Sequence, residues 1–312
     1  MTLIQQSLIA PKPISRGDKI GVVSLASVLD EARLLKGKEI LEETYGLEVI
    51  LGSHALDKHH NFAGNDATRL ADFQEMLDRA DIKAILAGRG GYGTSRIIDD
   101  VNWDSFKANP KWIVGFSDIT MAHLKLQSLG YQSIHAPMMV TMGNEVASTE
   151  SLLNALSGSQ LVYQERGHND NKIGDAEGQI IGGNLCLLAH NIGSTADLSF
   201  NGKILFIEDV GEYLYNIDRM MIQLKRAGKL DNLAGAVIGQ FSGSKENSTV
   251  FGKTAYEIIQ EHLSPYHFPI CYDFPIGHET ENRAIRCGEK MKLEVRKDFV
   301  RLSSGINLEI LS

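Results

Sequence analysis

Cysteine is scarce in this chain of 312 residues, which has only Cys186, Cys271 and Cys287. Their number is odd and they lie far apart, so the sequence favours neither a disulfide framework nor a thiolate metal site. The ten histidines are also scattered: only His59 and His60 are adjacent, and no zinc-type spacing occurs. We expect the cysteines to be small, buried, apolar residues.

Long apolar runs and basic runs are absent as well. No apolar stretch of the chain approaches the ~20 residues that cross a bilayer, and residues 1–12 lack the basic start and apolar core of a secretion signal. The net charge is −8, and no cluster of Lys and Arg is available to neutralise phosphates. We therefore expect a cytoplasmic protein that binds neither nucleic acid nor membrane.

The first half of the chain alternates between strand and helix patterns. Apolar runs predict buried strands at 19–26, 47–51 and 82–87, and helical spacing of apolar residues predicts helices at 30–45 and 66–79. This alternation predicts a parallel sheet with helices on both faces. Ligands of such sheets bind at the carboxyl ends of the strands.

The second half is richer in strand patterns. A polar, glycine-rich segment separates it from the first half, and its tail alternates like an antiparallel hairpin. We predict an α/β fold of two domains, since a chain of this length forms more than one core. The predicted parts are an N-terminal parallel-sheet α/β domain (1–157), a linker (158–175) and a smaller, strand-rich α/β C-terminal domain (176–312).

Ser117 lies between a short buried strand pattern, 112–114, and a helix pattern, 119–126. A serine on such a sharp turn is pushed out of the sheet, with backbone N–H groups behind it, as in a nucleophile elbow. The second glycine of the usual elbow is replaced here by Ile119. On these residues alone, Ser117 fits a helix N-cap as well as it fits a nucleophile.

A glycine-rich loop, Gly-Arg-Gly-Gly-Tyr-Gly at 88–93, follows the third predicted strand. It lacks the Lys-Ser/Thr ending of a phosphate-binding loop and does not follow the first strand, as a dinucleotide-binding loop does. Two interpretations remain open. The loop is either a tight turn that needs positive φ angles, or a source of backbone N–H groups that face Ser117.

Two residues of the second half could join Ser117. Glu208 ends an all-apolar strand pattern, where a carboxylate needs a partner, and His278 follows a glycine after another strand. Taken singly, each fits an ordinary structural residue. Together with Ser117 they supply a nucleophile, a base and an acid that orients the base.

Five motifs, in chain order, resemble those of the LD-carboxypeptidase family of serine peptidases, also called muramoyltetrapeptide carboxypeptidases. They are Gly-Arg-Gly-Gly-Tyr-Gly at 88–93, Gly-Phe-Ser-Asp-Ile-Thr at 115–120, Gly-Asn-Leu at 183–185, Ile-Glu-Asp-Val-Gly-Glu at 207–212 and Gly-His-Glu at 277–279. The resemblance extends from Gly17 to the C-terminus. It implies an N-terminal parallel α/β domain and a smaller C-terminal domain, with the active site between them.

The resemblance also implies roles for residues. Ser117 is the nucleophile, Glu208 the acid and His278 the base, and the backbone N–H groups of Gly91 and Asp118 form the oxyanion hole. The implied reaction releases terminal D-alanine from murein tetrapeptides during cytoplasmic cell-wall recycling, without metal or cofactor, and relatives suggest a homodimer. Candidates for binding the substrate, each equally open to a structural role, are Arg89, Asn184 and Arg69.

Two alternatives stay open. Microcin C self-immunity peptidases, in the same family, are similar at all three catalytic positions but carry a longer insertion before the glutamate. In this chain only 91 positions separate Ser117 from Glu208, which favours the carboxypeptidase. A non-catalytic module that binds murein peptides is the second alternative, and the presence of all three triad residues argues against it.

Overall fold

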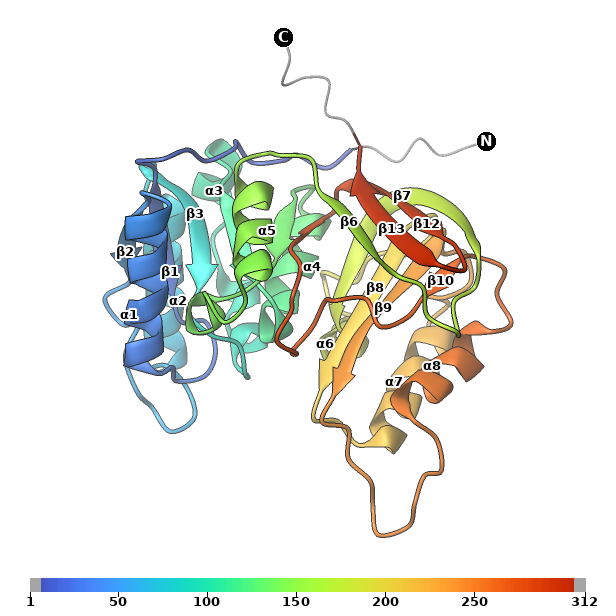
Figure 1. Ribbon diagram of the computed structural model, residues 1–312. Coiled ribbons are helices and arrows are strands. Elements are labelled where there is room, and N and C mark those ends of the chain that lie inside the picture. The colour runs from blue at the N-terminus through green and yellow to red at the C-terminus, as the bar shows by residue number, and fades with distance from the viewer. Residues whose placement is uncertain (1–6, 306–312) are drawn as a thin grey trace.

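Two β-sheets dominate the structure, a computed structural model that describes residues 7–305 (Figure 1). The strands of the first sheet are, in spatial order, β11 (Ile285–Cys287), β5 (Ser133–His135), β4 (Trp112–Gly115), β3 (Ile82–Ala87), β1 (Lys19–Val23) and β2 (Glu48–Leu51). All neighbours are parallel except β11, which pairs antiparallel with β5. The predicted parallel sheet is therefore confirmed, with one antiparallel strand added at its edge.

Helices cover both faces of the first sheet because successive strand residues point to opposite sides. Val22 and Val23 of β1, for example, belong to different apolar clusters. The helices of one face are α1 (Glu31–Glu39) and α5 (Val146–Leu156), and those of the other are α2 (Asp66–Asp78), α3 (Asp104–Ala108) and α4 (Thr120–Ser128). The predicted helix 30–45 ends in a π-helical turn, Ile40–Thr44.

The second sheet is mixed. Its strands are, in spatial order, β10 (Ile270–Cys271), β9 (Gly235–Ser242), β8 (Ile204–Val210), β7 (Gly174–Asn184), β12 (Lys290–Val295), β13 (Phe299–Ser304) and β6 (Val162–Arg166). The neighbours from β10 to β7 are parallel, and the rest are antiparallel. The predicted α/β class, with a strand-rich second half, is confirmed.

One face of the second sheet is covered by α6 (Leu185–Asn191), α7 (Leu214–Arg226) and α8 (Ala255–Leu263). Helix α7 buries Ile217, Met221 and Leu224, whose spacing of four and three residues places them on one side of the helix. Helix α8 starts with a capping box, in which Thr254 and Glu257 each accept the other's backbone N–H.

Two segments depart from the predicted division of the chain. The predicted linker, 158–175, contains strand β6, which pairs with β13 in the second sheet. Strand β11 comes from the second half of the chain but extends the first sheet. A polar segment can form an edge strand with one exposed face, which is why composition alone indicated a linker. The limits 1–157 and 176–312 stay a prediction.

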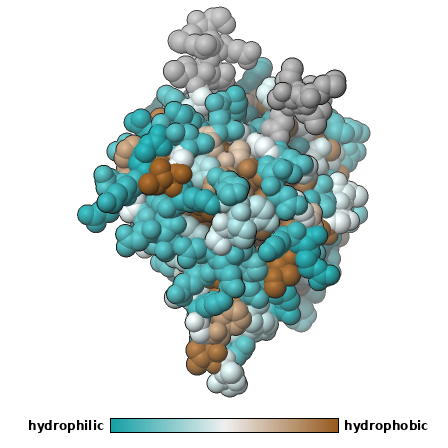
Figure 2. Space-filling model, turned by 90° about the vertical axis from the view of Figure 1, so that its right-hand side faces the viewer, coloured by the Kyte–Doolittle hydropathy of each residue, from teal (hydrophilic) through white to brown (hydrophobic). Residues whose placement is uncertain are grey.

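The surface turned to the viewer in Figure 2 is mostly polar, with apolar side chains in small separate groups. Within residues 7–305, no helix combines the length and the apolar character needed to cross a membrane. Cys271 and Cys287 are buried, as predicted, whereas Cys186 is half-buried.

His123 of α4 ties two strands of the first sheet together. Its Nε2 lies 2.8 Å from the carbonyl oxygen of Gly115 on β4, and its Nδ1 lies 2.8 Å from Oγ of Ser133 on β5. The ring is fully buried, and burial lowers its pKa to about 4. Since the Gly115 carbonyl only accepts, Nε2 carries the proton, and His123 is neutral near pH 7.

We predict that the free energy of unfolding falls as the pH drops from 6.5 towards 4. In that window the unfolded chain protonates His123 while the folded chain does not, and a pKa lowered to about 4 corresponds to a loss of roughly 3 kcal/mol. Urea denaturation at several pH values between 7 and 4 measures this loss of unfolding free energy. The His123→Gln variant serves as the control, and an equally steep pH dependence in that variant would contradict the prediction.

Candidate active site

Ser117 occupies a strained turn directly after β4. Its φ is +62°, in the left-handed region that non-glycine residues avoid. Holding a residue in this conformation costs about 1–3 kcal/mol. Phe116 before it is extended, and Ser117–Ile119 forms a single 3₁₀ turn that leads into α4. The Ser117 side chain caps neither this turn nor α4, so the structure supports the elbow geometry over the N-cap interpretation.

The glycine-rich loop lies against this turn. A Cβ built on Gly90 would come within 3.1 Å of the Ser117 Cβ, so a side chain at this position would press against Ser117. Gly91 has φ +112°, and a Cβ there would collide with Oγ of Ser27. The N–H of Thr94 donates to Asp118 Oδ2 at 2.8 Å and fixes the loop to the elbow. The loop therefore lies next to Ser117, and the positive φ angles of Gly91 and Gly93 fit the tight-turn interpretation as well.

Glu208 and His278 form a short hydrogen bond, with 2.6 Å between Glu208 Oε2 and His278 Nδ1. Glu208 is completely buried near the end of β8. The pairing of β8 with β9 shifts here, because Ile207 faces Ile238 whereas Asp209 faces Phe241. The extra residue in β9 is a bulge, a device that redirects side chains next to active sites.

The turn that carries His278 is anchored on both sides. Gln240, at the bulge, donates its N–H to the Ile276 carbonyl at 2.9 Å and accepts the N–H of Glu279 at its Oε1 at 3.3 Å. Gly277 has φ +143°, and a Cβ there would meet the Glu208 side chain at 3.3 Å. Glycine at this position lets the turn pass close over the buried carboxylate.

Opposing effects act on the pKa of His278. Burial lowers it, but the charge of Glu208, the hydrogen bond to that carboxylate and the charge of Asp209 raise it, and the pKa ends above its usual value of 6.5. An imidazole paired with a carboxylate in this way is held in one tautomer and is stabilised when it takes up a proton. This is the behaviour that a general base requires.

Ser117 joins this pair through its neighbour Phe116, whose ring centroid lies 4.8 Å from that of His278. Within residues 7–305, no hydrogen bond joins Ser117 and His278. Catalytic hydrogen bonds are often long before substrate binds. The structure thus pairs Glu208 with His278 and places the His278 ring against the residue before Ser117, and the contact between Ser117 and His278 stays a prediction.

Asn184, predicted to contact substrate, has its side chain engaged inside the protein. Its Nδ2 donates to Asp209 Oδ1 at 2.8 Å, and its Oδ1 accepts from the N–H of Leu187 at the start of α6. Its own N–H donates to Oγ1 of Thr120, the first residue of α4. Burial, followed by the charge of Glu208, raises the pKa of Asp209 to about 7. The geometry gives Asn184 a structural role, linking α4 to β8.

The two arginine candidates differ in exposure. Arg69 is buried and donates to the carbonyl oxygens of Leu25 and Gly93. Its guanidinium therefore holds the end of the glycine-rich loop in place. Arg89 is exposed on that loop, with a single hydrogen bond from its Nη1 to the Val28 carbonyl at 2.8 Å. Of the two, Arg89 has donors available for a ligand.

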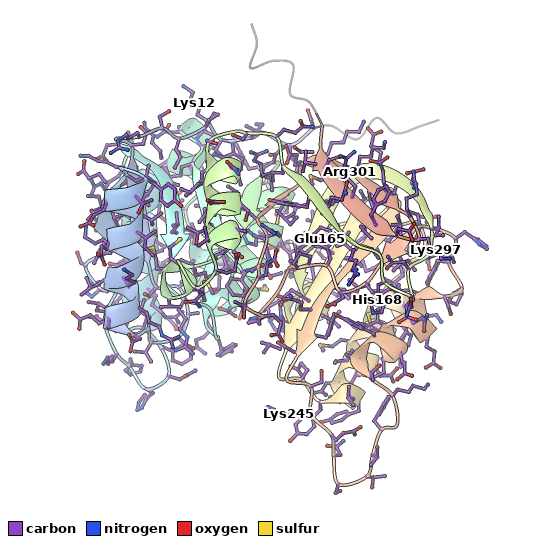
Figure 3. All side chains as sticks on the ribbon, in the orientation of Figure 1. Lys12, Glu165, His168, Lys245, Lys297 and Arg301 are labelled. Carbon is purple, nitrogen blue, oxygen red and sulfur yellow. The ribbon has the colours of Figure 1, made fainter. Side chains whose placement is uncertain are left out.

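A cavity of about 710 Å³ opens beside the His278 turn and was not predicted from the sequence. Its walls come from β9, the loop 243–254, the start of α8 and Glu279, the residue after His278. The loop projects at the lower end of Figure 1, and Figure 3 shows Lys245 near its base. Ser117, Glu208 and His278 do not line the cavity, which touches the His278 turn through Glu279.

The charge of this cavity is mainly negative. Four of its lining residues are acidic and one, Lys253, is basic, and Lys253 already pairs with Glu261. The acidic residues are Glu246, Glu257, Asp273 and Glu279. Elsewhere in residues 7–305, as here, no three His, Cys, Asp or Glu side chains are grouped so as to hold a metal ion.

Comparison with known proteins gives consistent matches over both sheets. The models of the LD-carboxypeptidase N-terminal and C-terminal domains match residues 20–136 and 177–293. A probable murein peptide carboxypeptidase of Bacillus subtilis is 32% identical over 304 residues, 95% of each chain. A murein tetrapeptide carboxypeptidase of Pseudomonas aeruginosa is 29% identical over 267 residues, 81% of this chain and 85% of its own.

Solved structures agree with these matches. The crystal structure of muramoyltetrapeptide carboxypeptidase from Oxalobacter formigenes superposes with a TM-score of 0.82 at 28% identity, over 92% of this chain and 98% of that one. A microcin C7 self-immunity protein in complex with glutamyl sulfamoyl guanosine reaches a TM-score of 0.85 over 96% and 99% of the two chains. At 21% identity the second likeness shows the fold alone.

Fold and matches together define a two-domain peptidase. The chain belongs to the LD-carboxypeptidase family, and the resemblance seen in its five motifs is confirmed.

We predict that the imidazole of His278 titrates above pH 6.5 and that Glu208→Gln moves this titration to lower pH. The charge of Glu208 favours the protonated ring, and the neutral amide removes that charge while keeping the shape. NMR titration of the imidazole signals measures both values. Glu177→Gln, on the exposed part of β7, is the matched control. An unchanged His278 titration in Glu208→Gln would contradict the prediction.

Proposed function

We propose that the protein is a serine carboxypeptidase that hydrolyses the amide bond before the terminal D-alanine of murein tetrapeptides, in cytoplasmic cell-wall recycling. The observation that carries the proposal is the buried Glu208–His278 hydrogen bond of 2.6 Å beside the left-handed turn of Ser117. The carboxypeptidase names of the B. subtilis and P. aeruginosa relatives support the choice of substrate.

In the proposed mechanism Ser117 Oγ attacks the carbonyl carbon of the residue before D-alanine. His278 accepts the hydroxyl proton at Nε2, since its Nδ1 faces Glu208, and then donates that proton to the leaving amine. Glu208 keeps the ring in this tautomer and stabilises the imidazolium. Water, activated by His278, releases the acyl group from Ser117. No step calls for a metal or a cofactor.

The negative charge on the tetrahedral intermediate needs hydrogen-bond donors. We assign them to the backbone N–H groups of Asp118, which follows the nucleophile, and of Gly91, in the loop that lies against it. The close approach of Gly90 to Ser117 supports this assignment. Removal of one such donor typically lowers turnover about 100- to 1,000-fold. Arg89, exposed on the same loop, is proposed to bind the terminal carboxylate of the peptide.

The cavity beside Glu279 offers room for the residue that precedes D-alanine. That residue is a diamino acid in murein peptides, and its second amino group is positively charged when free. The acidic lining of the cavity complements this charge, because opposite charges attract while like charges are repelled. We therefore place the side chain of the third peptide residue in the cavity.

Two competing functions predict different outcomes. A self-immunity peptidase would cleave an aminoacyl-nucleotide-type amide. The E. coli self-immunity protein is 25% identical to this chain in an alignment of 352 positions, gaps included, which covers 99% of each chain. A binding module would retain murein tetrapeptide without cleaving it. Mass spectrometry after incubation separates the three functions, since only the carboxypeptidase releases one D-alanine from the tetrapeptide.

The homodimer stays a prediction, and light scattering measures the oligomeric state.

We predict that Ser117→Ala abolishes release of D-alanine while peptide binding is largely kept. Loss of the nucleophile lowers turnover by about 10⁴-fold or more in serine peptidases, whereas the peptide's other contacts remain. Turnover is measured by mass spectrometry and binding by calorimetry. The exposed Ser157→Ala variant serves as the control, and an unchanged rate in Ser117→Ala rules the nucleophile out.

We also predict that kcat/KM depends on the charge of the third peptide residue, because Glu279 in the cavity wall attracts a positive side chain. For a tetrapeptide with lysine at that place, Glu279→Gln lowers kcat/KM by about two- to fivefold, the size of an exposed ion pair. The same variant leaves kcat/KM unchanged for a peptide with norleucine, which has the four-carbon side chain of lysine without its amino group. Glu177→Gln is again the control. Equal effects on both peptides exclude the ion pair.

A further inference from the structure

Asn282 lies four residues after His278 and is buried where the His278 turn meets the first sheet. Its Oδ1 accepts the N–H of Gly277, the residue before His278, at 3.1 Å. Its own backbone N–H donates to Oγ of Ser148, on α5, at 2.8 Å. One side chain thus closes the turn that carries the imidazole, and the same residue is fixed to a helix of the first sheet.

Oδ1 of Asn282 also lies 3.3 Å from Nε2 of His135, on β5. A backbone N–H can only donate, so the atom of Asn282 that faces Gly277 must be the oxygen. Nε2 of His135 therefore carries a proton and donates it. Burial holds the pKa of His135 well below 6.5, so the ring is neutral and its Nδ1 has neither a proton nor, within residues 7–305, a hydrogen-bond partner.

His135 stands next to the strand that ends at the nucleophile. It pairs with Gly115 on β4, two residues before Ser117. Its ring centroid lies 5.8 Å from that of Phe116, which in turn lies 4.8 Å from that of His278. Gly115, His135 and Asn282 thereby form a continuous path from the Ser117 turn to Gly277.

The segment after Asn282 reinforces this path. Ala284 donates its N–H to Oγ of Ser151, on α5, at 2.9 Å, and β11 then pairs with β5, with Ile285 opposite His135. The His278 turn is therefore held at its far end by the sheet that also carries Ser117. Ser117 and His278 do not bond each other directly, so their separation depends on such contacts.

We propose that Asn282 is a positioning residue that, through Gly277 and His135, sets the distance between the His278 imidazole and Ser117. The inference rests on the proposed hydrolase function. It assigns to Asn282 no contact with substrate. A displacement of about 1 Å between reacting groups lowers turnover by roughly 100-fold, so loss of this contact acts on kcat far more than on KM.

The test compares Asn282→Ala with Tyr163→Phe. The Tyr163 hydroxyl donates to the Ala284 carbonyl at 2.8 Å, so the control loses one buried hydrogen bond in the same segment without touching Gly277 or His135. For Asn282→Ala we expect kcat to fall about 100-fold, with KM changed by less than about threefold. Tyr163→Phe should keep kcat within about twofold, although both variants lower the melting temperature.

The conservative variant Asn282→Asp supplies the second readout. The carboxyl oxygens of the aspartate still accept hydrogen bonds from Gly277 and His135, so this variant should recover most of the kcat that Asn282→Ala loses. A side chain that only filled the space, without accepting these hydrogen bonds, would not restore kcat. Wild-type kcat in Asn282→Ala, or no recovery in a folded Asn282→Asp, overturns the positioning role. Equal losses of kcat in Asn282→Ala and Tyr163→Phe also overturn it, because activity would then follow stability.

Labelling of Ser117 by a fluorophosphonate separates this inference from the proposed substrate. The reagent needs an activated serine but no murein peptide. A wild-type protein that is labelled but does not cleave tetrapeptide contradicts the substrate alone, and the ratio of labelling rates between wild type and Asn282→Ala then tests the inference. A wild-type protein that is neither labelled nor active contradicts both.

Discussion

Burial of the Glu208 carboxylate is the constraint on which the rest of the site depends. A charge taken out of water destabilises the fold by several kcal/mol unless it is paired and hydrogen-bonded. Glu208 Oε2 has His278 at 2.6 Å, while Oε1 has no partner within residues 7–305. His278 therefore supplies the hydrogen-bond partner that the buried Glu208 needs. Bonding through Nδ1 leaves Nε2 as the nitrogen that is free for proton transfer.

The course of the chain explains how two sheets share one site. Parallel strands of both sheets end on the same side of the molecule, the lower side in Figure 1, so Ser117 after β4 and Glu208 in β8 reach the same region. The His278 turn leaves the second sheet and returns to the first as β11. The turn that carries His278 is thus held by backbone contacts to both sheets.

Local patterns in the sequence predicted much of this arrangement. Apolar runs and helical spacing predicted most strands and helices. A serine on a strand-to-helix turn, a strand-end glutamate and a histidine after glycine indicated the three candidate residues, of which Glu208 and His278 form a hydrogen bond. The sequence did not predict β6, β11, the β9 bulge or Asn282. β6, β11 and Asn282 depend on partners more than 100 positions away, such as β13 for β6 and Ser148 for Asn282. The β9 bulge depends on the pairing of β9 with β8. Nothing near Asn282 in the sequence distinguishes it from an ordinary turn residue.

The fold alone does not choose the substrate. A carboxypeptidase and a self-immunity protein share it with TM-scores of 0.82 and 0.85, so the difference must come from the walls around the triad. In this chain the wall beside His278 is acidic, and its one lysine is already paired. With the third peptide residue placed there as proposed, a negatively charged side chain would face like charge and a free amino group would face opposite charge.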